Sequence, residues 1–259
     1  AFSCCSSLTG SLTIPNRVMV ISAFAFSGCG FTGTLTLPAG LVEIQEYAFC
    51  NTKFKVELNI PSTVTTIGNF AFQNTLFNGT LVLPSELISL GTGVFWGCWR
   101  LSGVVEIPSN IVAIPSNLFS DCTWLEGVVL HKDVEVIEAS AFNNCYGIHS
   151  IVCKAKNPPV IDASSFNGVA KDNFTVEVPE ASVAQYRNAA NWSEFKRFAA
   201  HREFSISRNL FRTLNAAHSK TFVLCAPAGE NWSFFPVDDN RLAVWKETSG
   251  GLSLWSVEY

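Results

Sequence analysis

The chain of 259 residues is poor in charge and has no long hydrophobic run. Asp, Glu, Lys and Arg make up only 15% of it, and its formal net charge is -4 without any cluster of basic residues. Nucleic-acid-binding proteins neutralise phosphates with such a cluster, so the composition argues against that class. No apolar run reaches the ~18 residues that a membrane-spanning helix needs. The chain also opens without a secretion signal, and we expect it to begin inside a repeat, as a mature form or a fragment would.

Signatures of catalysis and of metal or cofactor binding are missing as well. None of the four histidines belongs to an HExxH motif, and the sequence has no GxGxxG motif, no P-loop and no CxxC pair. Two pairs of glutamates, Glu43 with Glu46 and Glu135 with Glu138, have a spacing that acid–base chemistry could use. We interpret them as solvated charges on outer turns. The sequence therefore predicts a protein that is not an enzyme and that holds neither a cofactor nor a metal.

What the sequence does have is a repeat. One phenylalanine recurs every 23 or 24 residues, at Phe2, Phe26, Phe49, Phe72, Phe95, Phe119, Phe142 and Phe166. Eleven residues before five of these phenylalanines stands a proline, at Pro15, Pro38, Pro61, Pro84 and Pro108. A short aliphatic run such as Leu35–Leu37 precedes each proline. His131 and Lys154 replace the proline in later copies, and we expect the repeat array to bend or loosen there.

Each aliphatic run has the pattern of a short strand. Alternate side chains of a strand face opposite sides, so the first and third residues point into a core and the middle one points outward. Proline cannot donate a ladder hydrogen bond, so it ends the strand. One copy cannot bury its apolar face alone, whereas stacked copies bury a continuous one. The pattern predicts a leucine-rich repeat solenoid with a parallel sheet, a short and mostly non-helical convex side, and a stack of phenylalanines opposite the sheet.

Cysteine recurs in the same register, three residues after the phenylalanine. It stands there in five copies, at Cys5, Cys29, Cys98, Cys122 and Cys145. Thr52 and Thr75 fill the place in the two copies between, and threonine cannot form a disulfide. The position therefore indicates a small, weakly polar, buried side chain, and we expect free thiols. Disulfides remain an alternative, because adjacent coils bring Cα atoms near the bonding range.

The repeat pattern fades towards the C-terminus, which suggests two domains. Residues 1–198 are predicted to form the solenoid, with about seven repeats and a helical cap near 180–198, because an open solenoid must cover its last apolar surface. Residues 199–259 contain short apolar runs at 204–206, 221–225, 232–235, 242–245 and 252–257. Turn signals such as Gly250-Gly251 separate them. We predict a small antiparallel β domain there, possibly a sandwich.

The repeat, L-x-I-P-x-x-V-x-x-I-x-x-x-A-F-x-x-C, resembles the BspA-type leucine-rich repeat, which is also described from treponemal surface proteins. The resemblance covers about residues 1–198, and the segment from Val178 to Phe195 is similar to the usual end of these arrays. The C-terminal segment is similar to BACON-type β-sandwich modules through Thr221–Leu224 and Asn231–Ser233. The resemblance implies a non-catalytic bacterial protein, secreted or held on the outer surface, that binds host matrix proteins, other bacteria or glycans.

Two surfaces are candidates for ligand binding. The first is the outward face of the sheet, made by Thr13, Thr36, Asn59, Val82, Glu106, Val129 and Val152. These residues could equally be β-branched only because they lie on a pleated surface. The second is a set of aromatic residues in the turn after the register phenylalanine, made by Trp96, Trp99, Trp124 and Tyr146. Such side chains suit sugar rings or protein anchors, or they could pack on the convex side or the C-terminal segment.

These features favour an adhesin-like module that binds a host or bacterial protein through the solenoid surface. The alternative is a glycan-binding accessory protein that uses the aromatic residues. Both hypotheses place the protein outside the cell or on its outer surface.

Overall fold

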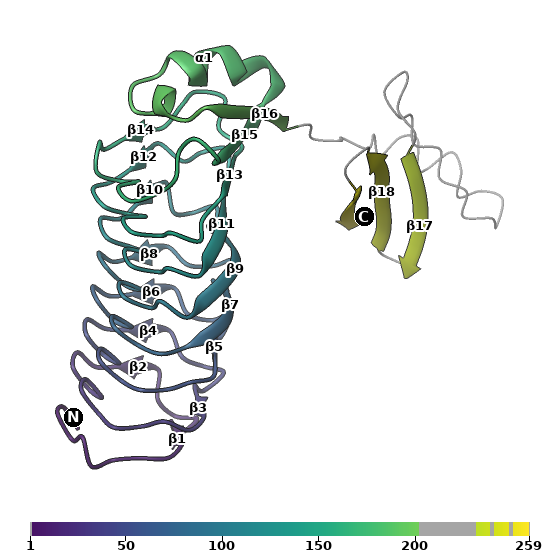
Figure 1. The fold of residues 1–259 in the computed structure, drawn as a ribbon. Coiled ribbons are helices and arrows are strands. Elements are labelled where there is room, and N and C mark those ends of the chain that lie inside the picture. Colours follow the sequence, from purple (N-terminus) through teal and green to yellow (C-terminus); the bar gives the residue numbers. More distant parts are fainter. Residues whose placement is uncertain (1, 202–231, 239–240, 249–250, 259) are drawn as a thin grey trace. The chain divides into compact units, whose positions relative to one another are not determined.

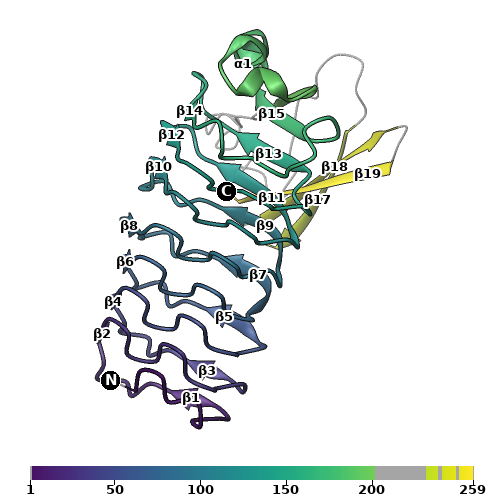
Figure 2. The same ribbon diagram turned by 60° about the vertical axis from the view of Figure 1, so that its left-hand side comes forward.

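The computed structural model describes residues 2–201, 232–238, 241–248 and 251–258. The chain divides into two compact units, Ala1–Glu203 and Phe204–Tyr259, and each is described by itself. In the first unit the chain winds through successive coils that stack along one axis, with a column of strands on each of two opposite sides (Figures 1 and 2).

The main column is a parallel sheet. Its strands are β1 (Leu12–Thr13), β3 (Leu35–Thr36), β5 (Glu57–Asn59), β7 (Asn78–Val82), β9 (Leu101–Glu106), β11 (Leu125–Leu130), β13 (Ser150–Cys153), β15 (Thr175–Pro179) and β16 (Arg197–His201). β1 pairs with β3, and the strands from β5 to β16 form one seven-stranded sheet. Pairing joins residues one repeat apart, as in Thr13 with Thr36 and Val129 with Val152. The predicted leucine-rich repeat solenoid with a parallel sheet is confirmed.

A second column of very short strands lies on the other side of the coils, and the sequence pattern did not predict it. It consists of β2 (Val20–Ile21), β4 (Glu43–Ile44), β6 (Thr66–Ile67), β8 (Ser89–Leu90), β10 (Ala113–Ile114), β12 (Val136–Ile137) and β14 (Val160–Ile161). These strands form a four-stranded and a three-stranded parallel sheet. In each strand the second residue is buried, as Ile44 and Ile67 show. Two residues are too few to display the alternation that identifies a strand in a sequence.

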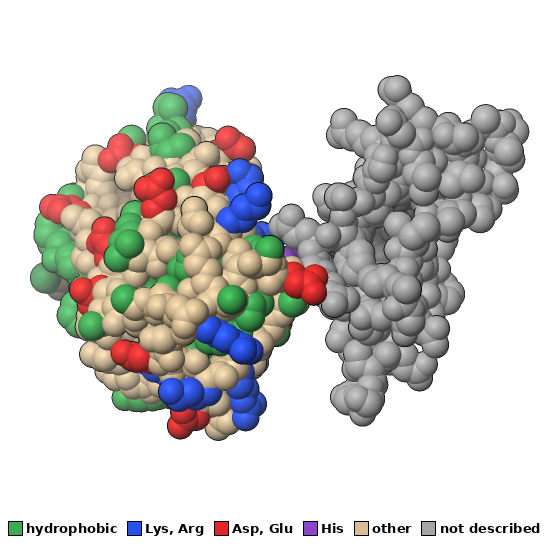
Figure 3. Space-filling model, turned by 90° about the horizontal axis from the view of Figure 1, so that it is seen from above, with side chains coloured by type: hydrophobic (Ala, Val, Ile, Leu, Met, Phe, Trp, Pro, Cys, Tyr) green, Lys and Arg blue, Asp and Glu red, His purple; other side chains and the backbone are tan. Residues whose placement is uncertain are grey.

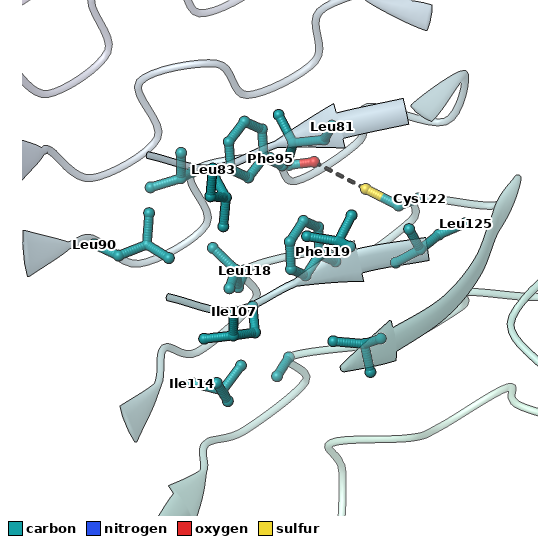
Figure 4. Close-up of a cluster of buried hydrophobic side chains, with 14 of the residues drawn as sticks. Leu81, Leu83, Leu90, Phe95, Ile107, Ile114, Leu118, Phe119, Cys122 and Leu125 are labelled. Carbon is teal, nitrogen blue, oxygen red and sulfur yellow. Dashed lines mark hydrogen bonds between the residues drawn. The ribbon is translucent and has the colours of Figure 1, made fainter. Parts of the chain in front are cut away.

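The register phenylalanines form one continuous stack. Consecutive ring centroids from Phe2 to Phe166 lie 5.9, 5.5, 5.5, 5.7, 5.6, 5.8 and 5.0 Å apart, and each pair is stacked. The five rings from Phe49 to Phe142 are completely buried. Figure 4 shows Phe95 and Phe119 among aliphatic side chains such as Leu81 and Ile107. The predicted spine is confirmed.

Every coil turns at a left-handed residue two positions after the register phenylalanine. The residues there are Cys4, Gly28, Asn51, Asn74, Gly97, Asp121, Asn144 and Gly168, with φ between 52° and 79°. Glycine, asparagine and aspartate tolerate this conformation best. The side chains also join coils, since Asn74 Nδ2 donates to Asn51 Oδ1 at 3.1 Å and Asn144 Nδ2 donates to Asp121 Oδ1 at 2.9 Å.

The ladder cysteines are free, buried hydrogen-bond donors. Cys29, Cys98, Cys122 and Cys145 are free and buried, which confirms the prediction for these four. Each thiol donates to the carbonyl oxygen of the register phenylalanine one coil earlier, and the Cys122 Sγ to Phe95 O distance is 3.1 Å (Figure 4). Thr52 is also buried and donates its hydroxyl to Phe49 O at 2.8 Å. The position therefore selects a small donor. Cys5 is exposed, because no earlier coil lies against it in this structure.

The expected loosening at the copies that lack proline does not occur. His131 occupies the strand end, where its Nε2 lies 3.0 Å from Ile111 O and its Nδ1 accepts a hydrogen bond from Asp133 N at 3.2 Å. In the next coil the backbone N–H of Lys154 donates to Leu130 O at 3.0 Å. The strands around both positions stay in register, because side-chain and ladder hydrogen bonds hold the corner where proline is absent.

A short helical segment covers the last coil at the C-terminal end of the first unit (Figure 1). It comprises the 3-10 turn η1 (Glu180–Ser182), helix α1 (Val183–Asn188) and the 3-10 turn η2 (Trp192–Glu194). Tyr186 and Trp192 are completely buried. The Tyr186 hydroxyl donates to Ala155 O at 2.8 Å, and Trp192 Nε1 donates to Pro159 O at 2.8 Å. β16 then returns to the sheet beside β15 and ends at His201, three residues past the predicted boundary at 198.

The surface at this covered end carries both acidic and basic side chains, without a large patch of one sign (Figure 3).

The described part of the second unit is a three-stranded antiparallel sheet of β17 (Trp232–Asp238), β18 (Arg241–Thr248) and β19 (Gly251–Glu258). These strands include three of the apolar runs that the sequence analysis singled out. The other two, 204–206 and 221–225, lie outside the described residues. A small β domain over 199–259, and its similarity to BACON-type modules, stay predictions.

Substitution of a phenylalanine by alanine should destabilise the protein much more in the middle of the stack than at its end. Phe95→Ala should lower the free energy of unfolding by about 3–5 kcal/mol, because it leaves a cavity between two stacked rings. Phe2→Ala should lower it by less than about 1.5 kcal/mol, since this ring is 54% exposed and has one stacked neighbour. Urea denaturation measures both values, and equal losses would contradict the stack as the source of stability.

The buried thiols predict a pH dependence of stability. Burial raises the pKa of Cys98 from 9.0 to about 11 and that of Cys145 to about 12. Unfolded thiols ionise first, so the free energy of unfolding should fall as the pH rises from about 9 towards these values. At pH 8 a thiol reagent should modify Cys4 and Cys5 in the folded protein and spare Cys98, Cys122 and Cys145. Mapping by mass spectrometry tests this, and rapid modification of the three buried thiols would contradict it.

Candidate binding surfaces

The outward column of the main sheet presents the side chains that the sequence analysis placed there. Thr13, Thr36, Asn59, Val82 and Glu106 are exposed, whereas Val129 and Val152 are half-buried. Strand pairing continues the column to two residues that the sequence analysis missed, Glu177 on β15 and Ala199 on β16. The run Val176-Glu177-Val178-Pro179 has the pattern of a strand followed by proline, which could have identified Glu177. Ala199 gave no such signal, because no proline follows it.

The middle of this face, on β7 and β9, exposes two valine side chains beside Glu106. Val82 is 72% exposed and Val104 is 48% exposed, although neither is needed to fill the core. A Cβ added at Gly127 would lie 3.3 Å from Val104 Cγ2, so this glycine lets the valine lie close to the neighbouring strand. Together with the half-buried Val129 and Val152, these two exposed residues give the sheet surface four valine side chains, which we call the valine face: Val82, Val104, Val129 and Val152.

The four aromatic candidates do not form one cluster. Trp99 and Trp124 contact each other edge to face, with ring centroids 5.6 Å apart, and they are 40% and 53% exposed. Trp96 is half-buried and donates its indole N–H to Asp121 Oδ2 at 2.8 Å. Tyr146 is exposed, and its hydroxyl donates to Asn144 Oδ1 at 3.1 Å. Within the described residues no ring contact joins Tyr146 to the tryptophans, so the structure brings together only Trp99 and Trp124.

A second aromatic column was missed by the sequence analysis. Phe24, Tyr47 and Phe70 stand two residues before successive register phenylalanines, and their ring centroids lie 4.8 and 5.0 Å apart. All three have a left-handed backbone, with φ of 56°, 53° and 56°. Later copies hold Gly93, Asn117 and Ser140 at this left-handed position. A side chain there costs about 1–2 kcal/mol relative to glycine, so the aromatic residues oppose the local backbone preference. Their recurrence in three successive copies was the available signal.

The two glutamate pairs are only partly the solvated charges that we expected. Glu46 and Glu135 are exposed. Glu138 is half-buried, and its Oε2 accepts hydrogen bonds from the backbone N–H and the hydroxyl of Ser116, at 3.0 and 2.9 Å. Glu43 Oε1 accepts a hydrogen bond from Gln45 Nε2 at 3.1 Å. The prediction was wrong for Glu43 and Glu138, because their carboxylates satisfy polar groups at the corners of the coils.

Two other features are absent from the described residues. They contain no group of three or more His, Cys, Asp and Glu side chains placed to hold a metal ion. They also contain no helix that combines the length and the apolar character needed to cross a membrane.

The contribution of the second aromatic column to stability can be tested at Tyr47. Tyr47→Asn removes two stacking contacts, worth about 0.5–1.5 kcal/mol each, and relieves the left-handed backbone. We expect the free energy of unfolding to change by less than about 1.5 kcal/mol in total, because the two effects oppose each other. Thermal and urea denaturation measure the change. A loss as large as that of a core phenylalanine would show that the column is chiefly structural.

Comparison with known proteins gives one family and several solved structures. The model of the BspA type leucine rich repeat region matches six copies, over residues 1–102 and 55–171. A leucine-rich repeat protein from Bacteroides ovatus ATCC 8483 is 16% identical, with a TM-score of 0.43, over 74% of this chain and 61% of that chain. A leucine rich cell surface protein from Faecalibacterium prausnitzii A2-165 is 20% identical, with a TM-score of 0.33, over 82% and 63%.

A leucine-rich repeat protein from Eubacterium ventriosum ATCC 27560 is 18% identical, with a TM-score of 0.45, over 62% of this chain and 59% of that chain. The chain thus spans 59–63% of the length of these three structures. No curated protein matches it in sequence. The family match covers residues 1–171, well over half of the chain, and agrees with the observed parallel solenoid. The chain belongs to the family of BspA-type leucine-rich repeat proteins.

Proposed function

We propose that the chain is a non-catalytic binding module that recognises a host or bacterial protein through the surface of its solenoid. The observation that carries this proposal is the valine face, where Val82 is 72% exposed and Val104 is 48% exposed. Exposed apolar side chains that lie together commonly mark sites of protein contact. The family resemblance supports a place outside the cell or on its outer surface, where a partner protein would be met.

The shape and chemistry of the valine face favour a protein over a charged ligand. Neighbouring strands of a sheet lie ~4.8 Å apart, so successive coils present a regular, nearly flat array of side chains. The centres of protein interfaces are depleted in charge, and the four side chains of the valine face carry none. Glu106 and Glu177 provide the acidic positions along the column. In this proposal residues 1–198 form the recognition array, and residues 199–259, which follow in the sequence, form a small β domain.

A second function, glycan binding, is favoured by the exposed Trp99–Trp124 pair. Tryptophan presents a flat apolar face that suits the C–H face of a sugar ring. Both indoles lie in the same turn of successive coils, and neither is needed to fill the core. A glycan-binding accessory protein therefore remains the alternative.

Substitution on the two surfaces separates these functions. The double variant Val82→Lys/Val104→Lys should weaken binding to a partner protein at least tenfold, because it places two charges in the proposed contact. Ser89→Lys, an exposed outward position on β8, is the matched control and should leave binding unchanged. Interferometry against a panel of matrix proteins and bacterial surface proteins measures the affinity of both variants.

Unchanged affinity in the double variant would refute the valine face as the binding surface. If the Trp99→Ala/Trp124→Ala variant loses all binding and the Val82→Lys/Val104→Lys variant keeps it, the result would favour the glycan alternative. Hydrolysis of any panel member by the purified chain would refute the non-catalytic role.

A further inference from the structure

Arg100 lies beside the exposed tryptophan pair and has no anionic partner among the described residues. Its guanidinium carbon is 5.3 Å from the centroid of the Trp99 ring. Its Nε is buried without a hydrogen-bond partner, and none of the ion pairs within the described residues includes this guanidinium. Withdrawing a cation from water without a counter-charge is unfavourable. The packing on Trp99 compensates part of that loss and holds the charge at the edge of the aromatic pair.

The local chain fixes these three side chains in place. Trp99 and Arg100 lie between two fully buried residues, Cys98 and Leu101, and the N–H of Leu101 donates to Cys98 O at 3.1 Å. One coil later the same turn places Trp124 between the buried residues Cys122 and Leu125, and the N–H of Leu125 donates to Cys122 O at 3.1 Å. Because the flanking side chains point inward, the indoles and the guanidinium are held at the surface.

The carboxylates of the next coil form no ion pair with Arg100. Asp121 already accepts hydrogen bonds from Trp96 Nε1 and Asn144 Nδ2. Glu126 follows Trp124 by two residues and is exposed, but it forms no ion pair with the guanidinium. The charge on Arg100 is therefore available to a ligand, and the planar fork of a guanidinium matches a carboxylate in a two-point hydrogen bond.

We propose that Trp99, Arg100 and Trp124 form a binding site for an acidic glycan, that is, an oligosaccharide with a carboxylate-bearing sugar. A pyranose ring packs on the exposed face of Trp124, which is the more open of the two indoles at 53%. The carboxylate of the same or the adjacent sugar accepts hydrogen bonds from Arg100. This inference rests on the alternative function above and adds to it the class of sugar and the residue that selects it.

The test uses a glycan array that carries matched pairs, each acidic glycan beside its neutral counterpart: sialyllactose with lactose, and oligogalacturonate with its carboxyl-reduced form. The full chain should retain the acidic member of at least one pair and not its neutral counterpart. Arg100→Gln should weaken that binding at least about tenfold, as loss of a charge-assisted hydrogen-bond pair does, and Trp124→Ala should do the same. Arg100→Lys should fall between, because it keeps the charge and loses the fork.

Two matched variants serve as controls. Arg17→Gln removes one charge from an exposed site elsewhere, and Tyr146→Ala removes an exposed aromatic ring that makes no ring contact with the pair. Both should bind like the unaltered chain. Equal losses in Arg17→Gln and Arg100→Gln would show general charge attraction and overturn the proposal. Circular dichroism and thermal denaturation confirm that each variant is folded.

The remaining outcomes separate this inference from the functions on which it depends. The unaltered chain could bind acidic and neutral glycans equally, with this binding lost in Trp124→Ala and kept in Arg100→Gln. That result would overturn the preference for acidic glycans and support glycan binding in general. If no acidic glycan is retained, the inference is wrong. Binding of a partner protein through the valine face would then still support the leading function.

Discussion

The stacking of one phenylalanine per coil is the constraint on which the rest of the structure depends. The rings lie 5.0 to 5.9 Å apart from Phe2 to Phe166, close to the ~4.8 Å separation that paired strands require. A stack of rings and a ladder of backbone hydrogen bonds can share one spacing only if every coil returns to the same place. Repeats of 23 or 24 residues meet this condition, and both strand columns follow from it.

The other recurring residues close each coil and link it to the next one. Left-handed residues such as Asn74 and Asp121 turn the chain after the phenylalanine, and their side chains link adjacent coils. The thiol of Cys122 supplies a donor to the Phe95 carbonyl oxygen inside the core, where water cannot reach. At the last coil the buried side chains of Tyr186 and Trp192 cover the core and donate hydrogen bonds to its backbone.

Much of the architecture could be predicted from the sequence because it repeats. The period revealed the stack, and the alternation before each proline revealed the main strands and their outward residues. The two-residue strands such as β6 were missed because a pair of residues shows no alternation. Surface contacts were harder still, since the spacing of Trp96, Trp99, Trp124 and Tyr146 does not reveal that only two of them touch. Arg100 gave no signal, because a missing counter-ion becomes visible only when the neighbouring coils are in place.

Because the core depends on a few inward positions per coil, the outward positions are free to differ, and the valine face and the Trp99–Trp124 pair are two such departures from the repeat. The stability of the solenoid then depends on whether neighbouring phenylalanines stabilise each other. A double-mutant cycle on Phe72 and Phe95, each changed to leucine, measures this directly. Adjacent rings should show a coupling free energy of about 0.5–1.5 kcal/mol, whereas Phe49 and Phe119, three coils apart, should show almost none. A Phe72–Phe95 coupling no larger than that of the distant pair would contradict the stacked column.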